Sequence, residues 1–178
     1  MRIDIPDIER RVRHIKLLLM DCDGVLTDGR IWLTPEGDEQ KGFHVRDGQG
    51  ISLFHHAGLK TGIISGRKSA AVERRAQELK ITFVRQYAND KVKAFEEILA
   101  EAGVTADDCA YIGDDLADIP LMRRVEVAIA VADATDETKE AAHYVTRAAG
   151  GHGAVREVCE IILKVQGRWD ELMRSFHA

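Results

Sequence analysis

The sequence predicts an α/β protein in which a parallel sheet is covered by helices on both faces. Short apolar runs alternate along the chain with stretches of helical periodicity. Strands that alternate with helices pair in parallel, because each helix carries the chain back across the sheet. With 178 residues, 45% of them hydrophobic, the chain can bury a sizeable core, and we expect one domain over residues 1–178.

The elements follow from these runs in chain order. The expected strands are residues 15–20, 60–64, 82–84, 109–112, 127–131 and 144–145. The expected helices are residues 50–57, 68–79, 91–102, 116–123, 137–142 and 154–165. The third helix has a clear apolar face, since Val92, Phe95 and Leu99 recur at spacings of three and four before Gly103 ends the pattern.

Two segments depart from the alternation. Residues 29–46 read as a β-hairpin, with apolar Ile31-Trp32-Leu33 before a polar tip. This hairpin, called the flap below, follows the first strand, at the sheet edge where open α/β folds bind ligands. The tail, about residues 166–178, carries an apolar stripe of Trp169, Leu172, Met173 and Phe176. That stripe would pack on its own domain.

Composition excludes several classes of function. The net charge is −5 and no stretch is strongly basic, so we expect no nucleic-acid partner. The first sixteen residues are polar and charged, and no apolar run is long enough for a membrane span, so we expect no signal peptide and no membrane contact. Cys22, Cys109 and Cys159 fit neither a disulfide framework nor a metal motif, and predict buried thiols in a cytoplasmic protein.

Polar residues follow four of the expected strands, and the carboxyl ends of parallel strands share one edge of a sheet. They are Asp21, Asp23, Ser65, Arg67, Lys91, Asp114, Asp115 and Asp118, with Gly66 and Gly113 beside them. Carboxylates crowded together repel one another unless a cation lies between them, and their oxygen atoms favour Mg²⁺. A lysine beside such a metal indicates that the substrate group is a phosphate.

The spacing of Asp21 and Asp23 indicates how a phosphoester would be cleaved. Residues i and i+2 of an extended chain point to the same side. Asp21 could then attack phosphorus, while Asp23 protonates the leaving oxygen and later deprotonates water. Gly24 would let the backbone turn away sharply. We therefore expect hydrolysis through a covalent aspartyl phosphate.

Four ordered segments resemble the motifs of the haloacid dehalogenase superfamily. They are Asp21-Cys22-Asp23-Gly24-Val25-Leu26, Ile63-Ile64-Ser65-Gly66, Lys91, and Gly113-Asp114-Asp115 with Asp118. The resemblance implies a Rossmann-like sheet, with Asp21 as nucleophile and metal ligand, Asp23 as acid/base with its carbonyl on the metal, and Asp114 as a further ligand. It also implies that Ser65 and Lys91 hold phosphate, and that Asp115 and Asp118 are supporting acids.

Longer segments resemble the family of 3-deoxy-D-manno-octulosonate 8-phosphate phosphatases. These are residues 43–50, 66–68, 111–116 and 150–158. The resemblance implies a hairpin flap without a cap domain, a homotetramer, and a step in lipopolysaccharide precursor synthesis. It also suggests that the apolar stripe of the tail lies over the active site of a neighbouring subunit rather than on its own domain. The implied substrate contacts are Asp23, His44, Val45, Arg46, Asp47, Gly48, Arg67, Arg75 and Lys91.

This sequence departs from the family pattern at two of its positions. His44 replaces an expected asparagine, and Ser52 falls where arginine is common. Both bear on substrate preference. Arg67 favours the eight-carbon sugar acid, whose carboxylate it would pair with, since phosphatases of nine-carbon sialic-acid-type sugars tend to carry an acid there.

Simpler structural interpretations remain for individual residues. Ser65 could be a helix cap, Arg67 and Arg75 exposed charges, Arg46 and Asp47 a pair at a helix start, and Asp115 and Asp118 helix-start or supporting residues.

Two alternative functions remain for the whole chain. One is a phosphatase for a nine-carbon keto sugar acid phosphate. The other is a phospho-aspartate signalling switch, although there the acidic pair follows the first strand and the acceptor aspartate comes later.

Overall fold

A six-stranded parallel sheet forms the centre of this computed structural model, which describes residues 5–174. The strand order is β5-β4-β1-β6-β7-β8. The strands are β1 (Leu17–Met20), β4 (Lys60–Ile64), β5 (Phe83–Arg85), β6 (Cys109–Gly113), β7 (Val127–Ala130) and β8 (Tyr144–Val145). The predicted fold class and all six predicted strands of this sheet are confirmed, with ends that differ by one or two residues.

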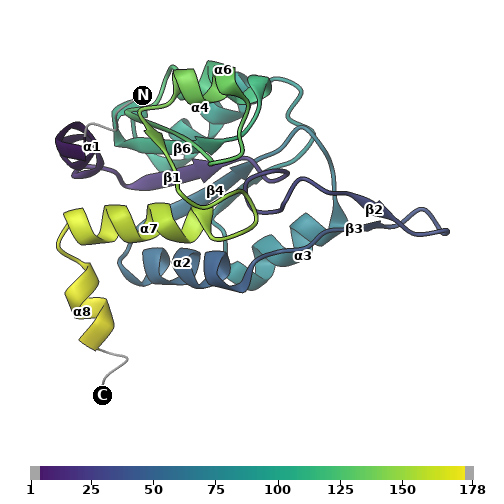
Figure 1. Cartoon of the computed structure of the whole chain (residues 1–178), viewed down its shortest axis with the longest axis horizontal. Coiled ribbons are helices and arrows are strands. Elements are labelled where there is room, and N and C mark those ends of the chain that lie inside the picture. The colour runs from purple at the N-terminus through teal and green to yellow at the C-terminus, as the bar shows by residue number, and fades with distance from the viewer. Residues whose placement is uncertain (1–4, 175–178) are drawn as a thin grey trace.

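Helices cover both faces of the sheet (Figure 1). On one face α2 (Val45–His56) packs against α7 (Ala154–Val165), and α1 (Ile5–Val12) and α3 (Ala70–Leu79) adjoin this layer. On the other face lie α4 (Lys91–Ala102), α5 (Ile119–Met122) and α6 (Asp136–Ala141). Short 3₁₀ turns η1 (Ala106–Asp108) and η2 (Leu116–Asp118) precede β6 and α5.

Two helix predictions were wrong in their boundaries. Helix α2 begins at Val45 rather than near residue 50, because Gly48 and Gly50 lower helix propensity yet are needed where α2 meets its neighbours. A Cβ on Gly50 would lie 3.0 Å from the Cα of Arg156 in α7. The expected helix 116–123 is divided into η2 and α5, with Pro120 in the first turn of α5. Helix α1 was not predicted.

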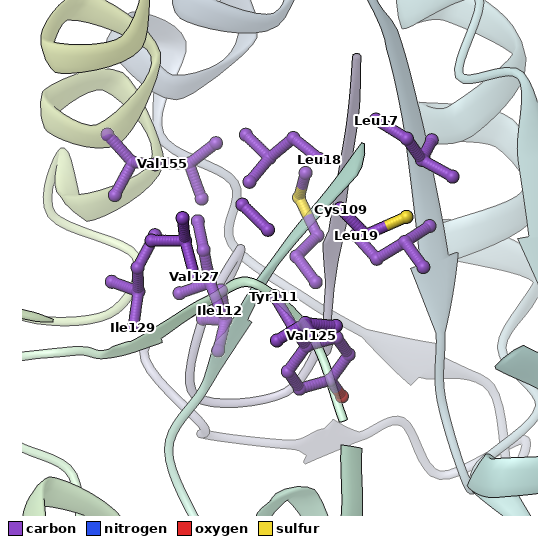
Figure 2. Packing of buried hydrophobic residues seen from close by; sticks show 14 of the residues in the cluster. Leu17, Leu18, Leu19, Cys109, Tyr111, Ile112, Val125, Val127, Ile129 and Val155 are labelled. Carbon is purple, nitrogen blue, oxygen red and sulfur yellow. The ribbon is translucent and has the colours of Figure 1, made fainter. Parts of the chain in front are cut away.

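The core lies around the central strands. Figure 2 shows Leu18 of β1 on the same side of the strands as Val155 of α7, and Leu17 and Leu19 on the opposite side. Residues Leu17 to Met20 are fully buried, as expected for a strand covered on both faces. The three cysteines are free and buried, as predicted.

The predicted hairpin is formed by β2 (Trp32–Leu33) and β3 (Glu39–Gln40), which pair antiparallel and project beyond the sheet (Figure 1). At the other end of the molecule α8 (Trp169–Arg174) follows α7, and Trp169, Leu172 and Met173 pack against the core of the same chain. Phe176, the last residue of the predicted stripe, lies outside the described residues. No helix among the described residues is long and apolar enough to cross a membrane.

Candidate active site

The candidate site lies where the strand order reverses. β1 pairs with β4 on one side and with β6 on the other. The chain leaves β1 towards α2 on one face and leaves β6 towards α5 on the opposite face. The loops after these two strands therefore diverge at the carboxyl ends of the strands, which is the position where open α/β sheets bind ligands. Asp21 follows β1 and Asp114 follows β6, so both carboxylates lie at this point.

Lys91 links two of the carboxylates. Its Nζ lies 3.1 Å from Oδ1 of Asp21 and 2.7 Å from Oδ1 of Asp118. The lysine side chain is 10% exposed, so solvent screens these charges weakly. Burial alone would lower the pKa of Lys91, but the carboxylates of Asp21 and Asp118 outweigh it and raise that pKa. The ammonium therefore stays charged beside the predicted nucleophile.

Asp118 is buried and accepts hydrogen bonds from three groups of this cluster. Its Oδ1 accepts hydrogen bonds from Lys91 and from the Tyr111 hydroxyl at 2.6 Å, and its Oδ2 accepts one from the backbone N–H of Asp114 at 3.0 Å. Tyr111 is fully buried in β6 and needs such an acceptor. Because both oxygens are engaged, Asp118 is suited to hold Lys91 and the Asp114 loop in place.

The acidic cluster fits a divalent cation. Asp21, Asp114 and Asp118 each offer a carboxylate oxygen, and these oxygens lie within 4.8 Å of one another. Oδ1 of Asp114 is buried without a hydrogen-bond partner among the described residues. Burial, together with the charges of Asp21 and Asp118, raises the pKa of Asp114 to about 8. Burial also raises the pKa of Asp21 to about 6, although Lys91 opposes this. Mg²⁺ prefers hard oxygen ligands, and these carboxylates, which repel one another, supply them.

Gly24 is where the loop after β1 meets Asp114. Its φ of +88° lies in the left-handed region, and a Cβ there would lie 2.1 Å from Oδ2 of Asp114. Gly150 packs closely against the same loop, since a Cβ on it would lie 1.7 Å from the carbonyl oxygen of Gly24. The predicted sharp turn at Gly24 is confirmed, and the glycines of residues 150–151 let the chain before α7 support it.

Gly24→Ala is expected to reduce activity at least about 100-fold and to destabilise the protein by about 1–3 kcal/mol, because the new methyl group displaces Asp114 and strains the backbone. Steady-state kinetics and thermal melting measure the two effects. Gly58→Ala is the matched control, with φ +78° and open space around its Cβ. It should share the strain but keep full activity. Equal activity losses in the two variants would contradict the role of Asp114.

Asp23 lies in a second group of charges. Lys41, from the hairpin, donates to Oδ1 of Asp23, and its ammonium lies 2.8 Å from Oε1 of Glu39. Oε2 of Glu39 accepts from Arg67 at 3.2 Å, and Nε of Arg67 lies 3.9 Å from Oδ2 of Asp23. Two acids and two cations thus alternate around a closed ring that joins the flap to the loops after β1 and β4.

Ser65 lies at the end of β4 and is buried. Its Oγ accepts a hydrogen bond from the backbone N–H of Arg67 at 3.3 Å. It is not the N-cap of α3, a position that Ser69 occupies. The turn of residues 65–67 therefore holds a hydroxyl and an arginine near the carboxylates of the first loop.

The structure places the implied substrate contacts of residues 44–48 in and just before the first turn of α2. His44 is the N-cap residue, and its Nδ1 is buried without a hydrogen-bond partner among the described residues. Val45 is 80% exposed. Asp47 is buried and accepts from the backbone N–H groups of Gly153 and Arg156, so its carboxylate is used at the start of α7.

The remaining predicted residues, Arg46, Arg75 and Asp115, have contacts outside the acidic cluster. Arg46 lines a groove with His152 and Arg156 rather than pairing with Asp47. Arg75 packs against Gly48 and lies over the ring of Phe43. Asp115 is exposed, and its side chain accepts from the N–H of Leu116 at 2.7 Å. Asp115 therefore starts η2, as the simpler interpretation expected.

Sequence reasoning missed Lys41, Glu39 and Tyr111. The only signal for Tyr111 was a hydroxyl within an otherwise apolar strand, which requires a buried partner. Glu39 and Lys41 are two positions apart in the second half of the hairpin, and this spacing places both side chains on one face of an extended chain. Which face met the sheet was not visible without the fold.

The fold is that of a haloacid dehalogenase-like hydrolase, and the model of that family matches residues 83–158. The chain is 44% identical over 165 residues to 3-deoxy-D-manno-octulosonate 8-phosphate phosphatase KdsC of Escherichia coli K12, covering 93% of this chain and 88% of that protein. A probable YrbI family phosphatase from Pseudomonas syringae has a structure similar to this one, with a TM-score of 0.95, 45% identity and coverage of 97% and 98%.

A third similar protein is 3-deoxy-D-manno-octulosonate 8-phosphate phosphatase from Moraxella catarrhalis, solved with a magnesium ion, a phosphate ion and a KDO molecule. It has a TM-score of 0.93 and 42% identity over 96% of this chain and 98% of that one. This chain belongs to the 3-deoxy-D-manno-octulosonate 8-phosphate phosphatase family, and it is an enzyme of the phosphatase class.

Proposed function

We propose that this protein hydrolyses 3-deoxy-D-manno-octulosonate 8-phosphate to the free sugar acid and phosphate, with Mg²⁺, as a step in lipopolysaccharide precursor synthesis. The observation that carries the proposal is the set of Asp21, Lys91 and Asp114 at the reversal of strand order. Relatives that carry this activity in their names cover nearly the whole chain.

The proposed reaction has two displacements. In the first, an oxygen of Asp21 forms a bond to phosphorus as the bond to the sugar oxygen breaks, and Asp23 gives its proton to that oxygen. In the second, Asp23 takes a proton from water, the water oxygen bonds to phosphorus, and the bond from phosphorus to Asp21 breaks. The products are the sugar acid and phosphate, and both aspartates return to their starting state.

The charges around Asp21 favour this chemistry. Lys91 lies 3.1 Å from the nucleophile and can hold a phosphoryl oxygen without moving far. Asp21 and Asp114, with the backbone carbonyl of Asp23, would hold Mg²⁺, which when bound neutralises phosphate charge. Ser65 would donate its hydroxyl to the phosphate. Asp118 would act through Lys91, to which it lies at 2.7 Å.

The sugar acid would lie between the flap and the start of α2. We propose His44, Val45, Arg46, Gly48, Arg67 and Arg75 as its contacts. Arg67 supports the eight-carbon substrate, because its guanidinium is half-exposed beside Asp23 and could exchange its contact with Glu39 for one with the carboxylate of the sugar acid. Asp47 would contribute by fixing α2 against α7.

The test is Mg²⁺-dependent phosphate release from 3-deoxy-D-manno-octulosonate 8-phosphate, with the nine-carbon sialic-acid-type 9-phosphate and an aryl phosphate alongside. A preference for the eight-carbon substrate of at least about 100-fold in kcat/KM supports the proposal. A preference for the nine-carbon substrate would replace it. A stable aspartyl phosphate that persists for minutes would favour the signalling switch.

We also propose a cytoplasmic homotetramer. Trp32 is 54% exposed and Leu33 71% exposed on a two-stranded hairpin, an apolar edge that other copies could cover. Light scattering at micromolar concentration should therefore give four times the 19.8 kDa chain mass. A monomer at that concentration would overturn the proposed assembly without affecting the chemistry.

A further inference from the structure

Lys41 contacts Asp23, but the proposed mechanism gives Lys41 no role. The Lys41 side chain is 0% exposed, although it comes from a hairpin whose tip projects into solvent. Burying an ammonium is costly unless acceptors surround it, and here Asp23 and Glu39 do so. The two carboxylates outweigh burial and raise the pKa of Lys41, so the group stays charged.

The two oxygens of Asp23 differ in their surroundings. Oδ1 accepts from Lys41, whereas Oδ2 is buried and has no hydrogen-bond partner among the described residues. Nε of Arg67 lies 3.9 Å from Oδ2, which is beyond hydrogen-bonding distance. A carboxyl group held at one oxygen has a single orientation, and the free oxygen is the one that can exchange a proton.

We propose that Lys41 is a positioning residue: it holds Oδ1 of Asp23 so that Oδ2 faces the leaving oxygen of the substrate. This inference rests on the proposed acid/base role of Asp23. Glu39 would in turn position Lys41, and through Arg67 it ties the flap to the turn after β4. The flap thereby completes the proton-transfer geometry in addition to covering the site.

The proposal predicts a dependence on the leaving group. A poor leaving group needs a well-placed proton donor, whereas an acidic phenol leaves with little help. Lys41→Met is compared with wild type by kcat/KM, which reports steps up to the first phosphoryl transfer, on aryl phosphates of one ring size that differ in phenol acidity. From 4-nitrophenyl to phenyl phosphate the loss caused by the substitution should grow at least about 5-fold.

A loss of the same size on every aryl phosphate, or no loss at all, would overturn the proposal, because a merely structural role of the flap does not depend on phenol acidity. Lys16→Met is the matched control, since Lys16 precedes β1 at the opposite edge of the sheet and pairs with Asp108. It should match wild type throughout. If Lys41→Met fails to fold, Lys41→Gln is judged by the same ratio.

The same experiment separates this inference from the proposed function. Aryl phosphates do not depend on the sugar, so the Lys41 test stands even if the wild type ignores the eight-carbon substrate. Asp23→Asn must itself lose most on phenyl phosphate. If it does not, the acid role of Asp23 fails, and the role of Lys41 falls with it.

Discussion

Asp21→Asn is expected to abolish phosphate release, with a loss of at least about 10⁴-fold in kcat. The amide keeps the shape of the carboxylate but cannot form the aspartyl phosphate. Lys91, 3.1 Å away, would keep its contact with Asp118, so the site should remain assembled. The measurement is phosphate release under saturating substrate and Mg²⁺, together with mass spectrometry of protein quenched in acid during turnover.

The covalent intermediate gives this prediction a second readout. Wild-type protein should gain the mass of a phosphoryl group under these conditions, and the variant should not. Asp107→Asn is a suitable control, because Asp107 is exposed in η1 before β6, away from the site. If Asp21→Asn retained even a tenth of the activity, direct attack by water would replace the covalent mechanism.

The parts of the site that sequence could predict follow from the parallel sheet. Lys91 and Asp21 are seventy residues apart, yet each follows a strand, and parallel strands end at one edge. That rule alone brings Asp21, Lys91, Asp114 and Asp118 together, as the structure has them. Local spacing was equally informative for α4, whose predicted bounds agree with Lys91–Ala102.

What could not be predicted depends on how the layers pack. The family resemblance implied that Asp47 contacts the substrate, and in the structure its carboxylate accepts from the backbone N–H groups of Gly153 and Arg156 at the start of α7, more than a hundred positions away. Lys41 enters the site because the base of the hairpin folds back over Asp23. No period or motif in the sequence encodes either contact, since both follow from where α2 and the flap meet the rest of the chain.

Removal of the metal is expected to cause the second large loss of activity. Chelation should lower activity at least about 10³-fold, and added Mg²⁺ should restore it, because a metal ion contributes several kcal/mol of charge stabilisation at phosphorus. The ion should also stabilise the fold, since the proposed ligands Asp21 and Asp114 come together only in the native state. At a hundred times its dissociation constant this is about 2.7 kcal/mol, which corresponds to about 5–10 °C in Tm for a chain of this size.

The stabilisation by Mg²⁺ should depend on pH with a definite sign. Burial raises the pKa of Asp114 to about 8 from its ordinary value of 3.8, so between these pH values the metal-free native state holds a proton that the unfolded chain has lost. Stability of the metal-free protein therefore falls through Asp114 as pH rises from about 4 to about 8. Asp21 adds a fall of the same sign up to about pH 6. Mg²⁺ must displace these protons, so its effect on Tm should be larger at pH 8 than at pH 5.

The variant Asp114→Asn separates the pH dependence due to Asp114 from that of the other titrating groups. His55 and His143 have pKa values lowered by burial, and they act with the opposite sign, since the unfolded chain binds their protons more tightly. The difference between wild-type and variant melting curves in chelator removes them. The variant should be the more stable of the two at pH 8 without metal, should approach wild type at pH 5, and should gain little from Mg²⁺. An equally large Mg²⁺ response in Asp114→Asn would place the ion elsewhere and remove Asp114 from the set of ligands.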